Sequence, residues 1–183
     1  MTDWQVISPE ETAHSAIAPL GIWGWPYLFC KRTTNPVTGE GRVWLGIAKD
    51  NKMISGSHWK WNMEWKVMMD GSDVLTDVAP AVGAAWGFPV VFVRRKTDGA
   101  IFYSTYKSSH ATPWQKLSGT TDRALAATGV FFVDKMHLFA FCKGIDNKVY
   151  YTRTSDSGDT KTWSQWAPIS NFETDRAPAS RFD

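Results

Sequence analysis

The sequence repeats itself, and this repetition constrains the fold more than any other feature. WGWPYLFCKR begins at Trp23 and WGFPVVFVRR begins at Trp86. A tryptophan that opens a short apolar run recurs at Trp4, Trp65, Trp114 and Trp166, and each copy is followed by Ala-Pro or Ala-Leu. Two independent markers that drift together indicate a structural repeat of roughly 50 residues.

Each repeat has the pattern of four short strands. In the second repeat, residues 78–86, 90–95, 100–106 and 114–118 are expected to be strands, with Asp98-Gly99 as a hairpin turn. The matching strands are 16–23, 26–32, 42–48 and 65–69 in the first repeat, and 124–132, 136–143, 148–153 and 166–170 in the third. In the first repeat, residues 49–64 are expected to be a long connection between the third and fourth strands.

This arrangement predicts an all-β fold, a β-propeller built of four-stranded antiparallel blades. A four-stranded sheet cannot bury both of its faces alone and must stack on a neighbour, and units of this size are typical of propeller blades. The alternative is a β-sandwich, which the constant strand order disfavours. Residues 1–183 are expected to form one domain, with repeats at about 14–70, 76–119 and 121–171.

The two ends are expected to add single strands, at 1–8 and 174–183. These strands either close the ring or pair with another chain. Because exposed strand edges are a liability for a monomer, we expect a homo-oligomer.

Charge and composition exclude several classes of function. The net charge is +2 and the cations are scattered, which disfavours nucleic acid as a partner. The sequence contains no run of 18 apolar residues, so membrane insertion is not expected. No secretory signal is visible at the N-terminus, so a cytoplasmic or non-classically secreted protein is expected. The two cysteines, Cys30 and Cys142, occupy equivalent places in two repeats and are interpreted as buried thiols rather than a disulfide.

Motifs for catalysis or for a cofactor are not evident. The sequence contains no Gly-x-Ser-x-Gly elbow, no phosphate-binding glycine loop and no Cys-x-x-Cys, and its four histidines do not pair at metal-binding spacing. The expectation is therefore a protein that is not an enzyme and that needs no cofactor or metal. Residues 154–163, TSDSGDTKTW, match a degenerate Asp box in which two residues are inserted before the tryptophan. This motif keeps a sialidase-like glycoside hydrolase fragment as an alternative.

The tryptophan that opens the outer strand, the LFCKR and VFVRR runs and the DGAIFY hairpin together resemble the β-propeller lectins of fungi and bacteria, of the Psathyrella velutina and Photorhabdus types. The resemblance covers nearly the whole chain. It implies fucose- or GlcNAc-type sugars bound in aromatic-lined sites between blades, with glycans or glycoconjugates as partners. A second alternative is a protein-interaction or structural propeller in which every tryptophan belongs to the core.

Ten residues are the candidate ligand-binding positions. Trp23 and Trp86 are either sugar platforms or core residues. Lys31 and Arg94 occupy a recurring cationic position and are either ligand donors or salt-bridge partners. The remaining candidates are His58, Trp59, Trp61, Asp98, Tyr103 and His110. Because the third repeat lacks the Trp-Gly-aromatic-Pro corner, binding is expected mainly in the first two repeats.

Overall fold

A computed structural model gives the fold of the chain. It describes residues 15–22, 24–55, 58–68, 73–132, 135–154 and 162–178, with the backbone alone described at 49–55, 58–62, 132, 170 and 171.

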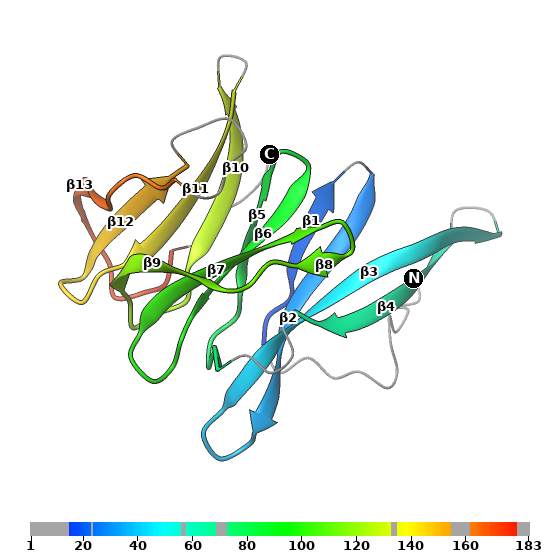
Figure 1. The fold of residues 1–183 in the computed structure, drawn as a ribbon, viewed down its shortest axis with the longest axis horizontal. Helices are drawn as coiled ribbons and strands as arrows, with labels where there is room; N and C mark the ends of the chain where they lie inside the picture. The colour runs from blue at the N-terminus through cyan, green and yellow to red at the C-terminus, as the bar shows by residue number, and fades with distance from the viewer. Residues whose placement is uncertain are drawn as a thin grey trace.

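The described residues form three antiparallel β-sheets and no helix (Figure 1). The first sheet contains β1 (Ala18–Ile22), β2 (Trp25–Asn35), β3 (Glu40–Ser55) and β4 (His58–Val67). The second contains β5 (Ala81–Ala85), β6 (Phe88–Arg94), β7 (Ala100–Lys107), the short β8 (His110–Ala111) and β9 (Gln115–Thr120), with both β8 and β9 paired to β7. The third contains β10 (Ala126–Phe132), β11 (Lys135–Lys143), β12 (Lys148–Arg153) and β13 (Ala167–Glu173). The prediction of an all-β fold is confirmed.

The first sheet departs from the prediction in one segment. Residues 49–64 were expected to form a loop, and this is wrong, because β3 continues to Ser55 and β4 begins at His58. The two strands stay paired along this extension, with Met53 opposite Trp59 and Asn51 opposite Trp61. The alternating composition of KWNMEWKV suits a paired strand, so a strongly aromatic segment extends the hairpin instead of forming a loop.

The second sheet lies between the other two, and the first strands of the three sheets are neighbours (Figure 1). One hydrophobic core joins the first and second sheets, around Phe29, Val91 and Phe102. A second core joins the second and third sheets, around Phe92, Tyr103 and Leu138. Each face of the second sheet is therefore covered by a neighbouring sheet, as stacked sheets require when one sheet cannot bury its own apolar faces.

A repeated turn carries the chain from one sheet to the next. The Thr76 hydroxyl accepts the Val78 N–H, and the Thr121 hydroxyl accepts the Arg123 N–H in the same way. Thr174 makes this turn again by accepting the Arg176 N–H at 3.1 Å. Such turns are favoured by threonine because its hydroxyl bonds backbone two residues ahead. Within the predicted end strand 174–183, residues 174–178 thus form a turn without strand pairing, and the other end strand, 1–8, lies outside the described residues.

Both cysteines are buried and free, which confirms the interpretation of Cys30 and Cys142 as thiols. Across the described ranges, no helix is long and apolar enough to span a membrane.

Candidate functional site

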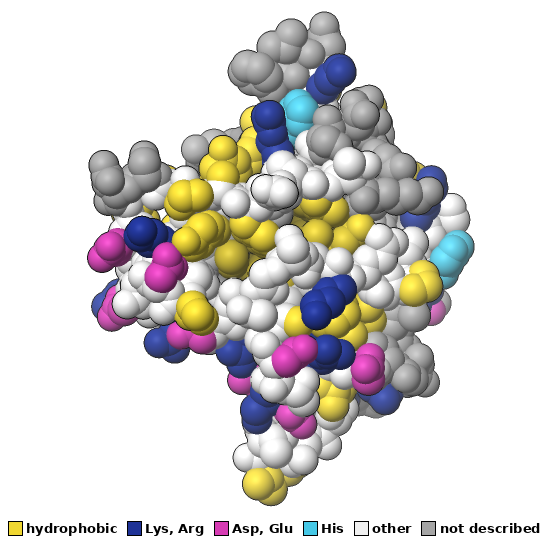
Figure 2. Space-filling view, turned by 60° about the vertical axis from the view of Figure 1, so that its left-hand side comes forward, with side chains coloured by type: hydrophobic (Ala, Val, Ile, Leu, Met, Phe, Trp, Pro, Cys, Tyr) yellow, Lys and Arg dark blue, Asp and Glu magenta, His cyan; other side chains and the backbone are white. Residues whose placement is uncertain are grey.

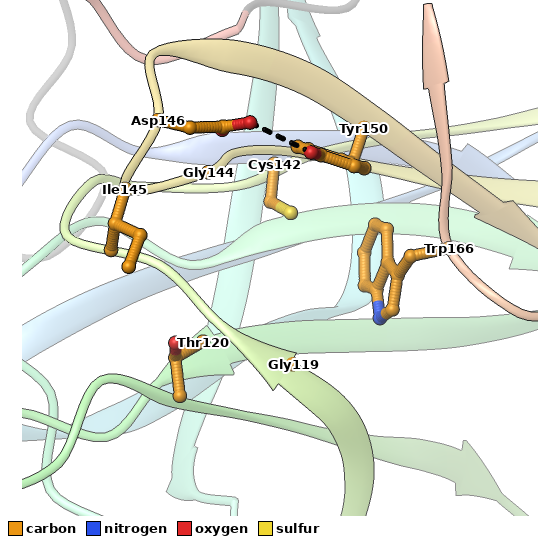
Figure 3. Close-up of a pocket in the computed structure, with 8 residues that line it drawn as sticks. All are labelled: Gly119, Thr120, Cys142, Gly144, Ile145, Asp146, Tyr150 and Trp166. Carbon is orange, nitrogen blue, oxygen red and sulfur yellow. Dashed lines mark hydrogen bonds between the residues drawn. The ribbon is translucent and has the colours of Figure 1, made fainter.

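A cavity of about 330 Å³ lies at the junction of the second and third sheets (Figure 3). Its walls come from the end of β9, the end of β11 with the turn that follows it, β12, and the segment before β13. The lining residues are Gly119, Thr120, Cys142, Gly144, Ile145, Asp146, Tyr150 and Trp166. This volume lies at the lower end of the range of small-molecule sites, which are concave, mostly apolar and supplied with a few polar groups.

Trp166 bridges the two sheets and forms one wall. It belongs to the third sheet's connecting segment, and its indole N–H donates to the Ser118 carbonyl on β9 at 2.6 Å. Gly119 has a positive φ of +88°, and a Cβ at this position would lie 3.3 Å from the indole nitrogen. The positive φ of Gly119, in the irregular part of the β9 register against β7, therefore lets the backbone approach the ring closely, so the indole is held in one orientation beside the cavity.

Asp146 and Tyr150 supply the polar wall. The Tyr150 hydroxyl donates to Asp146 Oδ2 at 2.8 Å (Figure 3). This hydrogen bond holds the pKa of the Asp146 carboxyl below its usual range, with help from the Lys148 backbone N–H, and it raises the pKa of Tyr150. At neutral pH the cavity therefore contains an ionised carboxylate beside a neutral phenol, both able to bond hydroxyl groups of a ligand.

In the first two sheets an arginine, Arg32 or Arg95, follows the recurring cation, and the third sheet has no arginine at this position. Arg95 stacks on Phe102 at 4.8 Å, pairs with Asp98, and reaches Asp73 at 3.4 Å across the junction of the first and second sheets. Likewise, Arg32 stacks on Trp44 at 4.2 Å.

In the third sheet this position is Gly144, one residue after the recurring cation Lys143. A Cβ at Gly144 would lie 2.5 Å from Asp146 Oδ1 and 2.7 Å from Tyr150 Cε2. The glycine therefore permits the bonded Asp146 and Tyr150 pair to close over it, and no long side chain extends from this position into the space toward β9.

Cys142 lies at the buried end of the cavity. Burial raises the pKa of its thiol to about 12, so the thiol is protonated and neutral at physiological pH. No group of three or more metal-ligating side chains occurs within the part of the chain that the structure describes.

The recurring cations make structural contacts. Arg94 donates from Nη2 to both carboxylate oxygens of Asp77, with 2.6 Å between Nη2 and Oδ2, and Lys143 pairs with Asp122 at 3.1 Å. Lys31 donates to the carbonyls of Gly39 and Asp77. The contacts of Arg94 and Lys143 are those of the salt-bridge alternative, whereas Lys31 bonds backbone carbonyls.

The other described candidates also lie outside the cavity. Tyr103 is buried, donates to Gln115 and contacts the edge of the Trp163 ring. Asp98 accepts from Arg95 and from the Ala100 N–H, so it stabilises its own turn. His110 is exposed and bonds the Ser108 carbonyl.

Trp86 forms the turn between β5 and β6, together with Gly87. Both residues have positive φ, 52° and 78°, in a two-residue hairpin loop, and the Trp86 side chain is 40% exposed. Positive φ is costly for a bulky residue. From this turn, β6 runs to the hairpin turn after Arg95, which is bonded to the end of β9 beside the cavity. The Trp86 turn therefore lies at the opposite end of the sheet from the cavity.

Four candidates and one motif cannot be placed. Trp23 and the side chains of His58, Trp59 and Trp61 lie outside the described residues, as do residues 155–161 of the Asp-box-like segment. Thr154 and Trp163, at the two ends of that segment, are joined by a β-bridge, and Trp163 packs in the core edge-on to Phe92.

Searches against protein-family models and against curated proteins return no match to this chain.

Proposed function

We propose that this protein is a non-catalytic lectin whose three sheets are blades of a β-propeller and whose sugar site is the cavity between the second and third sheets. The observation that carries the proposal is the combination of Trp166, Tyr150 and ionised Asp146 around one cavity at a sheet junction. Aromatic rings offer flat apolar platforms with polar edges, and a carboxylate accepts hydrogen bonds from hydroxyl groups.

The proposed ligand is a neutral monosaccharide unit of a glycan, with fucose- and GlcNAc-type sugars as the first candidates from the sequence resemblance. The indole of Trp166 provides the stacking surface, while Asp146 and the Thr120 hydroxyl receive or donate the polar contacts. Hydrolysis of a glycosidic bond normally uses two carboxyl groups across the bond, and Asp146 is the single carboxylate among the described residues that line the cavity.

The test is a monosaccharide binding series followed by isothermal titration calorimetry or ligand-observed NMR. Trp166→Ala and Asp146→Asn are each expected to weaken binding of the best sugar at least about 10-fold, because the first removes the stacking surface and the second removes a charged hydrogen-bond acceptor. Trp25→Ala is the matched control, because Trp25 is 42% exposed at the start of β2 and does not line the cavity.

Two results would overturn the proposal. In the first, no sugar in a broad glycan array binds the wild-type chain. In the second, Trp86→Ala abolishes sugar binding while Trp166→Ala leaves it unchanged, which would assign the site to the hairpin turn at the other end of the sheets.

A further inference from the structure

The third sheet presents an aromatic face on the side that points away from the second sheet. Phe139 and Phe141 on β11 stack with ring centroids 6.3 Å apart, and Tyr151 on β12 lies 6.2 Å from Phe139. All three rings are half-buried, and Val130 beside them on β10 is 40% exposed. Figure 2 shows this side of the molecule, where hydrophobic side chains gather across the centre of the view. We call Val130, Phe139, Phe141 and Tyr151 the forward face.

The strand registers identify the same positions in the other two sheets. Phe141 pairs with Tyr151 as Phe92 pairs with Tyr103 and Phe29 with Leu45. In the first two sheets these positions are covered by the next sheet along the chain: Phe29 and Phe92 are fully buried, Tyr103 is 3% exposed and Leu45 is 1% exposed. The forward face of the third sheet is thus the third copy of a packing surface whose other two copies are both covered.

The complementary surface is on the first sheet. The side chains of β2 that face the second sheet are Tyr27 and Phe29, so Leu28 points to the opposite side. By register this side also includes Pro19, Trp44 and Met63. We call Pro19, Leu28, Trp44 and Met63 the receiving face.

The equivalent receiving positions are buried in the second and third sheets. Leu28 corresponds to Val91 and Ala140, which are both 0% exposed, and Pro19 corresponds to Val82 and Ala127, at 6% and 1%. In the first sheet, by contrast, Pro19 is exposed and Leu28, Trp44 and Met63 are half-buried. Among the described residues, therefore, one surface of each complementary kind is not covered by another sheet.

Covering the forward face takes a whole sheet. In the second sheet, the equivalent rings Phe92 and Tyr103 are covered by Trp163, which precedes the last strand of the third sheet, as well as by residues of β10 and β11. In the first sheet, Met63 has the register position of Trp163, because it pairs with Ala48 as Trp163 pairs with Thr154.

We propose that the forward face of one copy of this chain packs against the receiving face of the first sheet of a second copy. The contact is head-to-tail, and two such contacts bring six sheets into one closed assembly, within the range of four to eight blades found in propellers. Arg153 is exposed and pairs with Phe139 in the register, so it lies on the forward face beside the aromatic rings, and its charged end must reach solvent at the edge of the contact. This inference concerns assembly and does not depend on sugar binding.

The first measurement is solution mass by sedimentation equilibrium of the full chain at about 1–100 µM, a range that detects micromolar dimers. The expected mass is twice the 20.6 kDa of one chain. Phe141→Glu on the forward face and Leu28→Glu on the receiving face should each give a monomer, because each places a charge in both contacts of the dimer. Val37→Glu is the control, since Val37 is 91% exposed in the β2–β3 turn and should leave the mass unchanged.

Mixing the two variants makes the test specific for a head-to-tail contact. The Leu28→Glu chain keeps an intact forward face and the Phe141→Glu chain keeps an intact receiving face, so the mixture should form a heterodimer with one intact contact. Near-UV circular dichroism of each variant checks that its sheets remain folded, and Val130→Glu replaces Phe141→Glu if the latter unfolds. A monomeric wild type overturns the proposal, as does a dimer that survives both variants or that mixing does not restore.

Discussion

Leu138 and Gly83 form a tightly fitted pair at the junction of the second and third sheets, and this pair allows a quantitative test of the packing. Leu138 on β11 is fully buried, and a Cβ built on Gly83 in β5 would lie 2.4 Å from Leu138 Cδ1. The leucine side chain therefore occupies the space that the missing side chain of Gly83 leaves.

Leu138→Ala removes three carbon atoms from this core. At about 0.8 kcal/mol per buried methylene, the lost transfer free energy is about 2.4 kcal/mol. The remaining cavity adds to this cost, since leucine-to-alanine changes in cores range over about 2.7–5 kcal/mol. We expect the free energy of unfolding to fall by about 3–4 kcal/mol, measured by urea denaturation with tryptophan fluorescence and an unchanged m-value.

The second change closes a double-mutant cycle. Gly83→Ala alone should destabilise the fold by about 1–3 kcal/mol, because its methyl group overlaps the leucine. In the double variant the new methyl enters the space that Leu138→Ala has vacated, so the combined cost should be less than the sum by at least about 1 kcal/mol. Val37→Ala, at an exposed turn position, should change the stability by less than about 0.5 kcal/mol. Additive costs, or a loss below about 1.5 kcal/mol for Leu138→Ala, would refute this account of the junction.

Four further outcomes are expected. Trp86→Asn should raise the urea midpoint, because asparagine adopts the positive φ of this two-residue hairpin turn with less strain than tryptophan. The expected gain in the free energy of unfolding is about 1 kcal/mol. Gly144→Ala should displace Tyr150 and Asp146 and weaken sugar binding, read by calorimetry, with little loss of thermal stability. Cys142, with a pKa of about 12, should react with a thiol reagent at pH 8 about a thousandfold more slowly than an unhindered cysteine. Stability should fall below about pH 4, since the pKa of Asp98 is lowered in the folded state and its contribution is lost as the carboxylate is protonated.

Each of these outcomes has a contrary result. An unchanged or lower midpoint for Trp86→Asn would show that the tryptophan side chain stabilises the turn. Wild-type sugar affinity in Gly144→Ala would separate the site from the Asp146 and Tyr150 pair. Rapid labelling of Cys142 in the folded protein would place its thiol in contact with solvent. Equal acid sensitivity of Asp98→Asn and the wild type would remove Asp98 as a cause of the pH dependence.

The strands and turns could be read from the sequence because their causes are local. Alternating apolar residues in VFVRR and AIFY determine which faces are buried, and the Asp-Gly and Thr-Asp pairs mark turns through their own backbone bonds. The same reasoning failed at residues 49–64, where pairing with β3 decided the structure of a segment that was expected to be a loop.

The candidate site was harder to predict, although one signal was available. Arg32 and Arg95 follow the recurring cation in the first two repeats, and Gly144 replaces them in the third. The missing corner tryptophan made the third repeat the weaker binding candidate from sequence. In the structure, the glycine is what leaves room for the cavity, while Trp166, noted only as a repeat marker, forms its wall.

The sequence by itself thus determined three antiparallel strand units, most of their turns, the buried thiols and the recurring cations, since each depends on neighbours within one repeat. The tertiary structure decided which faces of the sheets meet, that Arg94 pairs with Asp77, and that Trp166 reaches across to β9. These contacts join residues that are distant along the chain, and their geometry depends on how the sheets stack. The position of a cavity between two sheets therefore becomes visible only when both sheets are in place.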